Sequence, residues 1–352
     1  MKKTVLSLAA LAALMGAGAA QAQSSVTLYG LMDAGLENTS NATPAKGAQT
    51  RVVSGGMNTS RWGVRGTEDL GNGLKALFQL EGGIMIDTGA QDGALFKRQA
   101  NVGLEGGFGR VIMGRSFTTT YDFMLPFDPM GYAPNYSWAT SANASGPSKY
   151  GMTTAFDNLI KYAGKAGDFK FGASYGMGEQ ASGTADSAKL AAGVGYASGP
   201  LSFVATYEQV NGNTVAATAN RDKTTVAHLG AMYSNGPLKV QAAARDFKKV
   251  AGAAATPDVR GTLYWTGVSY KTTPAMTLTG AVYYQNVKNS AANADPIMYV
   301  GRLRYAMSKR TDLYLAAAFA KAKNDQLVSL SRDDAGFSDT QRGVTAGIQH
   351  RF

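Results

Sequence analysis

The sequence predicts an all-β protein whose strands close into an antiparallel barrel that crosses a membrane. Apolar and polar residues alternate along many segments, as in strands with one apolar and one polar face. Short turn-like links alternate with long polar links, which is typical of a membrane barrel with tight hairpin ends on one side. The chain has 43 glycines among 352 residues, above the average usage of about 7%, which favours many turns.

The composition excludes several classes of protein. The chain has no cysteine, which excludes disulfides and thiolate nucleophiles, and with only two histidines we expect neither a metal site nor a cofactor. The mean hydropathy is −0.14, and no run of about 20 apolar residues follows the N-terminus, so a bundle of membrane helices is excluded. The net charge of +10 comes from dispersed basic residues, and we expect no nucleic-acid partner.

The N-terminus has the pattern of a secretory signal. Two lysines precede the apolar stretch 5–14, which ends near the small-residue motif Ala20-Gln21-Ala22. The apolar stretch is too short for a membrane anchor. We expect residues 1–22 to be a signal peptide that is cleaved on export, and residues 23–352 to form the barrel domain.

Strand alternation is clearest at the two ends of this domain. The segment 26–36 carries small or apolar residues on one face and Asp33 on the other, and the final segment places Val344 and Ile348 opposite Gln349. Extended along the chain, this pattern predicts sixteen strands at 26–36, 57–67, 74–84, 96–105, 109–115, 156–163, 168–176, 188–197, 201–209, 224–234, 238–247, 261–270, 275–285, 297–306, 312–320 and 341–352.

A soluble β-sandwich is the alternative to a barrel, because its strands also have one apolar face. Many of the predicted strands reach about ten residues, the length that spans a membrane, and the chain ends on an alternating strand with the aromatic residue Phe352. Strands at both chain ends also allow closure, which removes the unpaired edges that lipid does not tolerate. These observations favour the barrel.

Several motifs resemble the Gram-negative general porins, most of all the branch with anion-preferring members. The similarity extends through nearly all of residues 23–352 and rests on Ser25–Gly30, Ser60–Ala76, Phe96-Lys97-Arg98, Gly107–Arg110 and Gly347–Phe352. The resemblance implies a 16-stranded homotrimeric barrel in the outer membrane. Such a barrel forms a water-filled channel for small hydrophilic solutes and inorganic ions. Its implied partners are outer-membrane lipid, lipopolysaccharide and the barrel-assembly machinery.

The resemblance also implies that the third outer loop folds into the pore. The longest link, 116–155, is the candidate for this constriction loop, and its acidic residues Asp122 and Asp128 are candidate pore charges. The link 85–95 corresponds in position to the loop that latches neighbouring subunits in these porins. Phe352 resembles the terminal aromatic signal that the assembly machinery recognises.

Arginines on the opposite wall are the remaining candidates for the constriction. The resemblance places Arg61 and Arg98 there, and alternation supports Arg61 because Trp62 would face lipid. A strict period of two turns Arg98 outward and Gln99 inward, unless a bulge or the strand end rotates them. Lys97 is therefore an alternative to Arg98 as the basic pore residue of this segment. Arg115, at the entrance of the loop, either contacts solutes or bonds loop carbonyls. The secondary candidates are Asp33, Arg65, Lys97, Gln99, Arg110 and Lys161.

One departure from the family pattern bears on ion preference. Anion-preferring relatives carry a basic pore residue on the strand after the constriction loop, where this chain reads Thr154-Ala155-Phe156-Asp157 and the nearest basic side chain is Lys161. Arginines that face aspartates across a narrow gap nevertheless create a transverse field. We therefore expect a weak to moderate anion preference.

Two other functions are compatible with a membrane barrel. An adhesin or structural barrel would have a plugged lumen and would not conduct ions. A barrel hydrolase would depend on His228 or His350 as its base, although His350 fits the outer face of the last strand. We do not expect the protein to be an enzyme.

Overall fold

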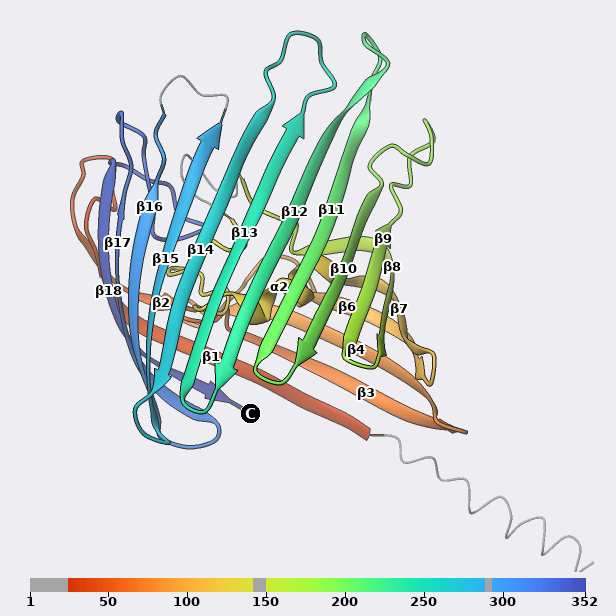
Figure 1. Cartoon of the computed structure of the whole chain (residues 1–352), viewed down its shortest axis with the longest axis horizontal. Helices are drawn as coiled ribbons and strands as arrows, with labels where there is room; N and C mark the ends of the chain where they lie inside the picture. The colour runs from red at the N-terminus through yellow and green to blue at the C-terminus, as the bar shows by residue number, and fades with distance from the viewer. Residues whose placement is uncertain (1–24, 142–149, 289–292) are drawn as a thin grey trace, which may run out of the picture.

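The computed structural model describes residues 25–141, 150–288 and 293–352 and has the form of a closed barrel (Figure 1). The expected signal peptide, 1–22, lies outside these residues. The strands are β1 (Ser25–Thr39), β2 (Gln49–Ser54), β3 (Arg61–Gly71), β4 (Leu74–Met85), β5 (Ala90–Gln91), β6 (Gln99–Gly106), β7 (Gly109–Phe117), β8 (Ala155–Ala166), β9 (Phe169–Gly176), β10 (Lys189–Ser198), β11 (Leu201–Val215), β12 (Asn220–Asn235), β13 (Leu238–Val250), β14 (Val259–Lys271), β15 (Met276–Lys288), β16 (Ile297–Ala306), β17 (Thr311–Lys321) and β18 (Thr340–Arg351). The helices are α2 (Thr119–Met124) and the 3-10 turn η1 (Leu125–Phe127).

The strands form a sixteen-stranded antiparallel barrel, as predicted. Strands β2 and β3 pair with successive parts of β1 and together make one barrel strand. Strand β5 is a two-residue extension that pairs with the end of β4. The first strand, β1, pairs with the last, β18, so the ring has no free edge. Each of the sixteen predicted segments overlaps one barrel strand.

The predicted faces are also confirmed. In β18, the side chains of Val344 and Ile348 are 48% and 46% exposed, whereas Thr345 and Gln349 are almost fully buried. The apolar residues of this strand thus point out of the barrel, and its polar residues point into it. Among the described residues, no helix is long and apolar enough to cross a membrane.

The break between β2 and β3 has a physical cause in β1. Asp33 accepts hydrogen bonds from the backbone N–H of Asn58 at 2.9 Å and from the Tyr314 hydroxyl at 2.7 Å. Ser60 donates its hydroxyl hydrogen to the Asp33 carbonyl at 3.1 Å. The chain between β2 and β3 therefore makes hydrogen bonds with Asp33 and does not pair with a neighbouring strand there. For this reason the strand predicted at 57–67 begins only at Arg61.

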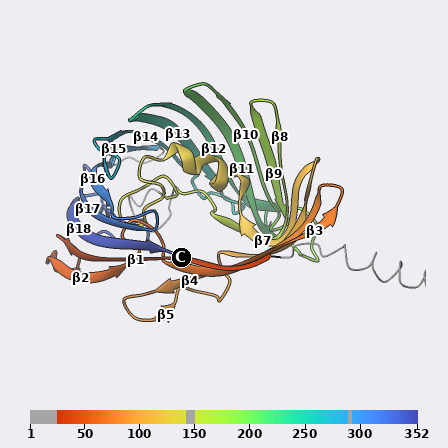
Figure 2. The same cartoon turned by 90° about the horizontal axis from the view of Figure 1, so that it is seen from below.

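The lumen is occupied by the long link between β7 and β8, which lies inside the ring of strands together with α2 (Figure 2). Its side chains form the centre of the main buried apolar cluster, which includes Met130, Tyr136 and Trp138. The last long link, 322–339, also enters the lumen, because Val328 and Leu330 are buried in the same cluster. Part of the first of these two links, 142–149, lies outside the described residues.

Candidate functional site

The link 116–155 is fixed to the inner wall by hydrogen bonds from wall side chains to its carbonyl oxygens. Thr118 caps α2 by accepting from the Tyr121 N–H at 3.0 Å. Beyond the helix, the chain crosses the inner faces of β13 and β14. The wall donors are Gln241 Nε2 to the Pro126 carbonyl at 2.7 Å, Trp265 Nε1 to the Phe127 carbonyl at 3.0 Å, and Arg245 Nη1 to the Ala139 carbonyl at 2.6 Å.

Asp128 is the centre of a buried anchor and not an open pore charge. Its side chain accepts hydrogen bonds from the Tyr283 hydroxyl, the Ser137 hydroxyl at 2.8 Å and the Tyr132 N–H at 2.6 Å. The residue is only 3% exposed. Burial raises the pKa of the Asp128 carboxyl, and these hydrogen bonds oppose the rise. Asp128 therefore does not face the arginines across a gap, contrary to the prediction from the sequence.

Arg61 and Arg98 converge on one carboxylate of the barrel wall. Glu81 Oε1 lies 2.7 Å from Arg98 Nε, and Glu81 Oε2 lies 3.9 Å from Arg61 Nε. Arg61 is on the inner face of β3, as alternation predicts, because it is in register with the inward-facing Gly83 and Leu31.

Arg98 also points inward. It precedes β6, so the alternation of side chains along that strand does not determine its direction. Its guanidinium lies 5.1 Å from the centre of the Phe117 ring. Gln99, the first residue of β6, is inward as well, since its side chain accepts from Ser116 Oγ at 2.9 Å. Both sequence alternatives thus point into the lumen.

Arg115 reaches the lumen because β7 bulges beside it. The pairing of β7 with β8 shifts between Gly114 and Ser116, and Gly114 has a φ of 124°, which favours glycine. The Arg115 guanidinium binds the Lys97 carbonyl and the Asp157 carboxylate. Lys97 itself pairs with Asp92 at 2.6 Å.

The other candidates are distributed toward the short turns of the barrel. Lys161 Nζ binds Asp122 and the Phe117 carbonyl, the latter at 2.8 Å. Asp122 thus pairs with the wall and not with the arginines. Arg110 Nε lies 3.8 Å from Glu105. The remaining two are Arg65, which lies 5.0 Å from the Tyr29 ring centre, and Asp33, whose side chain is buried between strands.

A cavity of about 580 Å³ separates the arginine wall from the two inner links. Lys97, Arg98 and Arg115 line one side, and Pro134, Thr140 and Arg332 line the other. The Arg332 guanidinium donates to the Tyr132 carbonyl at 3.2 Å and to Thr59 Oγ1 at 3.3 Å. The acidic residues that line this cavity are Asp87, Asp92, Asp333 and Asp334.

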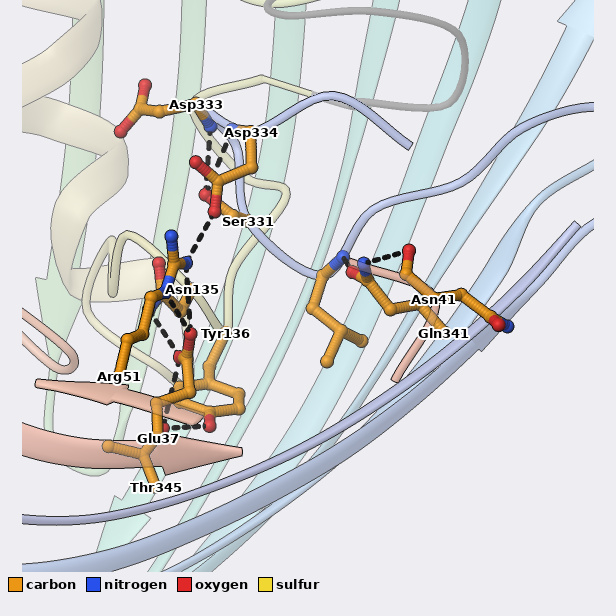
Figure 3. A network of polar contacts seen from close by, with 11 residues as sticks. Glu37, Asn41, Arg51, Asn135, Tyr136, Ser331, Asp333, Asp334, Gln341 and Thr345 are labelled. Atoms are coloured by element: carbon orange, nitrogen blue, oxygen red, sulfur yellow. Dashed lines mark hydrogen bonds and ion pairs between the residues drawn. The ribbon is translucent and has the colours of Figure 1, made fainter. Parts of the chain in front are cut away.

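A polar network joins the last link to the first strands (Figure 3). Arg51 Nη2 lies 3.0 Å from Glu37 and 2.6 Å from Asp334. Asn135 of the constriction candidate donates to the other oxygen of Glu37 at 2.7 Å. Glu37 therefore ties both inner links to β1.

Sequence reasoning missed the last link as part of this site, because it identified 321–340 only as a long polar stretch. The available signal was the apolar pair Val328 and Leu330 within that stretch, which is unusual for a solvated outer loop. Both side chains are buried against the first inner link, and Trp138 Nε1 donates to the Ser329 carbonyl at 3.1 Å.

Comparison with known proteins identifies the family. The sequence model of the family described as "Gram-negative porin" matches residues 7–325. The chain belongs to the Gram-negative porins. This porin is 36% identical over 368 residues to outer membrane porin protein 32 of Delftia acidovorans, and each chain is covered in full. It is 31% identical over 404 residues to an outer membrane porin protein of Bordetella pertussis, again over both full lengths.

Solved structures agree with this family. The structure titled "Anion-selective porin from Comamonas acidovorans" matches with a TM-score of 0.82 and 28% identity, covering 94% of this chain and 100% of that one. The trimer form of OmpT from Vibrio cholerae matches with a TM-score of 0.72 over 94% and 99% of the two chains. Its 16% identity supports the fold alone. This porin is an outer-membrane channel protein whose strands span the membrane.

Proposed function

We propose that this porin is a diffusion channel for small hydrophilic solutes and inorganic ions with a weak to moderate anion preference. The observation that carries the proposal is the inward-folded link 116–155, which leaves a polar cavity beside the arginine wall. A sixteen-stranded barrel is wide enough for an aqueous channel. The folded link reduces this channel to a passage that selects by size, and the last link narrows it further.

The charges of this passage support a transverse field. Arg61, Arg98 and Arg115 project from one wall, with Arg332 and Asp334 on the facing last link. Charges that face each other across a narrow, poorly screened gap orient dipolar solutes. In this proposal the acidic side of the field is supplied by the last link, while Asp128 is buried as the anchor of the constriction loop and the half-exposed Asp122 pairs with Lys161. The full-length similarity to a porin described as anion-selective supports the expected sign.

Planar-bilayer recording of the purified protein tests this function. We expect stepwise ohmic conductance and a reversal potential of the anion-selective sign in a KCl gradient. A clear cation preference would overturn the predicted selectivity. A folded barrel without conductance steps would overturn the channel itself and favour the plugged structural barrel.

The assembly of the channel is part of the same proposal. We propose a homotrimer, with the link 85–95 as the latch between subunits, and cleavage of residues 1–22 on export. An unheated gel should preserve the trimer, and mass spectrometry should give a mature N-terminus at Gln23. Contact with lipopolysaccharide and recognition of Phe352 by the barrel-assembly machinery complete the expected partners. Deletion of Phe352 should lower the amount of assembled barrel.

A further inference from the structure

The arginine wall, the cavity beside it and the facing last link are here called the upper passage. The cations of the upper passage are paired with carboxylates. Arg61 and Arg98 share Glu81, and the three other wall cations each have a carboxylate of their own: Arg115 with Asp157, Lys97 with Asp92, and Arg51 with Glu37 and Asp334. Arg332 Nε lies 3.3 Å from Asp333. A paired cation acts mainly as a dipole at distances larger than the pair. The upper passage therefore has a strong transverse field and little net positive charge.

Three inward-facing cations on the other side of the constriction loop differ from this pattern. Lys170, Lys239 and Arg302, here called the basic arc, are all half-buried. Within the described part of the chain, no carboxylate oxygen lies within 4.0 Å of any of them. Arg302 Nε is buried without a hydrogen-bond partner among the described atoms.

The basic arc follows the constriction loop on its short-turn side. Lys170 Nζ lies 4.7 Å from the centre of the Phe123 ring in α2. Lys239 is two residues before Gln241 on the same face of β13, and Gln241 holds the Pro126 carbonyl.

The arc ends at Arg302, whose Nη2 lies 3.5 Å from the Pro129 carbonyl. Lys170 and Lys239 are each the second residue of a strand that starts at a short turn. An ion that passes the constriction toward the short turns therefore meets three wall cations in succession.

These placements have an electrostatic consequence. Carboxylates act on the basic arc only from beyond 4.0 Å: Asp122 on Lys170, Asp128 on Lys239, and Asp128 and Asp312 on Arg302. A formal charge outside an ion pair keeps more of its field than a paired one, and this field reaches about a Debye length, which is about 10 Å at 0.1 M salt. The paired arginines act over a shorter range because their fields partly cancel. We infer that the basic arc, and not the paired arginine wall, sets the anion preference of the channel. This inference rests on the proposed function, and it assigns the selectivity to three residues that the function alone does not identify.

The test replaces the arc and compares it with a matched set of lysines. The variant Lys170→Gln, Lys239→Gln, Arg302→Gln removes three positive charges from the short-turn side. The control variant Lys46→Gln, Lys288→Gln, Lys323→Gln removes three exposed lysines, two from the long links and Lys288 from the end of β15 that precedes a long link. Both variants lose the same net charge. Each is inserted in planar bilayers, and its reversal potential is measured in gradients of KCl near 0.1 M.

We expect the arc variant to lower the chloride-to-potassium permeability ratio about five- to tenfold, because a unit charge about 10 Å from the ion path changes monovalent-ion occupancy about twofold even in water. The control should shift it less than twofold. Equal shifts in both variants, or an unchanged ratio in the arc variant, would overturn the inference while the channel function stands. Failure of the wild-type protein to conduct would overturn the proposed function instead.

A second variant keeps the test decisive if the triple replacement does not assemble. Lys239→Gln alone leaves the contacts of Phe123 and Pro129 intact, and heat-modifiable migration on a gel reports its folding. It should lower the permeability ratio about twofold, and the difference from wild type should shrink as KCl is raised toward 1 M. A ratio equal to wild type at 0.1 M KCl would contradict the inference.

Discussion

Replacing Asp128 with alanine should release the constriction loop from the barrel wall. The change removes the acceptor of four hydrogen bonds, from the Tyr283 hydroxyl, the Ser137 hydroxyl, the Tyr132 N–H and, at 3.4 Å, the Met130 N–H. Each buried donor left without an acceptor costs about 1–3 kcal/mol, and because nearby losses are not additive and water can enter, we expect about 3–6 kcal/mol in total. At 1.4 kcal/mol per tenfold, the detached population of the loop rises by about 10²–10⁴.

Single-channel recording measures this release directly. Asp128→Ala should give a larger mean conductance and more current noise than wild type, and liposome swelling should admit larger sugars. Asp122→Ala is the matched control, because it removes an acidic residue of the same loop that is half-exposed and lies outside the buried anchor. Conductance and noise equal to wild type in an assembled Asp128→Ala barrel would refute the role of this residue as an anchor.

Three further predictions concern the same passage. Burial raises the pKa of Asp128, so the part of the loop's stability that is linked to protonation of this carboxyl is fully present below the unfolded value of about 3.9 and is lost as pH rises through the folded value; current noise should rise with pH in wild type and much less in Asp128→Asn. Glu81→Gln removes the carboxylate that the two wall arginines share, so anion preference should increase, and a reversal potential that moves toward potassium would contradict this. Gly267→Ala would place a methyl group 2.5 Å from Cγ of Pro129, so we expect the constriction loop to shift and the single-channel conductance to change. A conductance equal to wild type would show that strand β14 moves in place of the loop.

The barrel could be predicted from the sequence because its pattern is local. A strand in lipid needs an apolar residue at every second position, and the chain repeats this alternation in each span, as with Val344 and Ile348 opposite Gln349. The exception is the start of β3, where the side chain of Asp33 takes the place of strand pairing. A hydrogen bond between residues 25 positions apart is invisible to a pattern with a period of two.

The candidate site was predictable only where strands define it. Arg61 faces inward by alternation, but Arg98 precedes its strand and Arg115 lies beside a bulge, so neither follows the period. The position of Asp128 depends on Tyr283, 155 residues away in sequence. The path of an inner loop is fixed by such distant wall contacts, and its composition alone does not reveal which acidic residue is buried.

The pairing of β1 with β18 constrains how this chain can be made. The seam joins Asp33 to Gln349, 316 positions later, and the backbone N–H of Phe352 donates to the Gly30 carbonyl at 3.1 Å. A nascent polypeptide that has crossed the inner membrane up to β17 still lacks the partner for its first strand. Because closing so long a loop is entropically costly and slow, the emerging chain must be kept from aggregating until its final strand arrives.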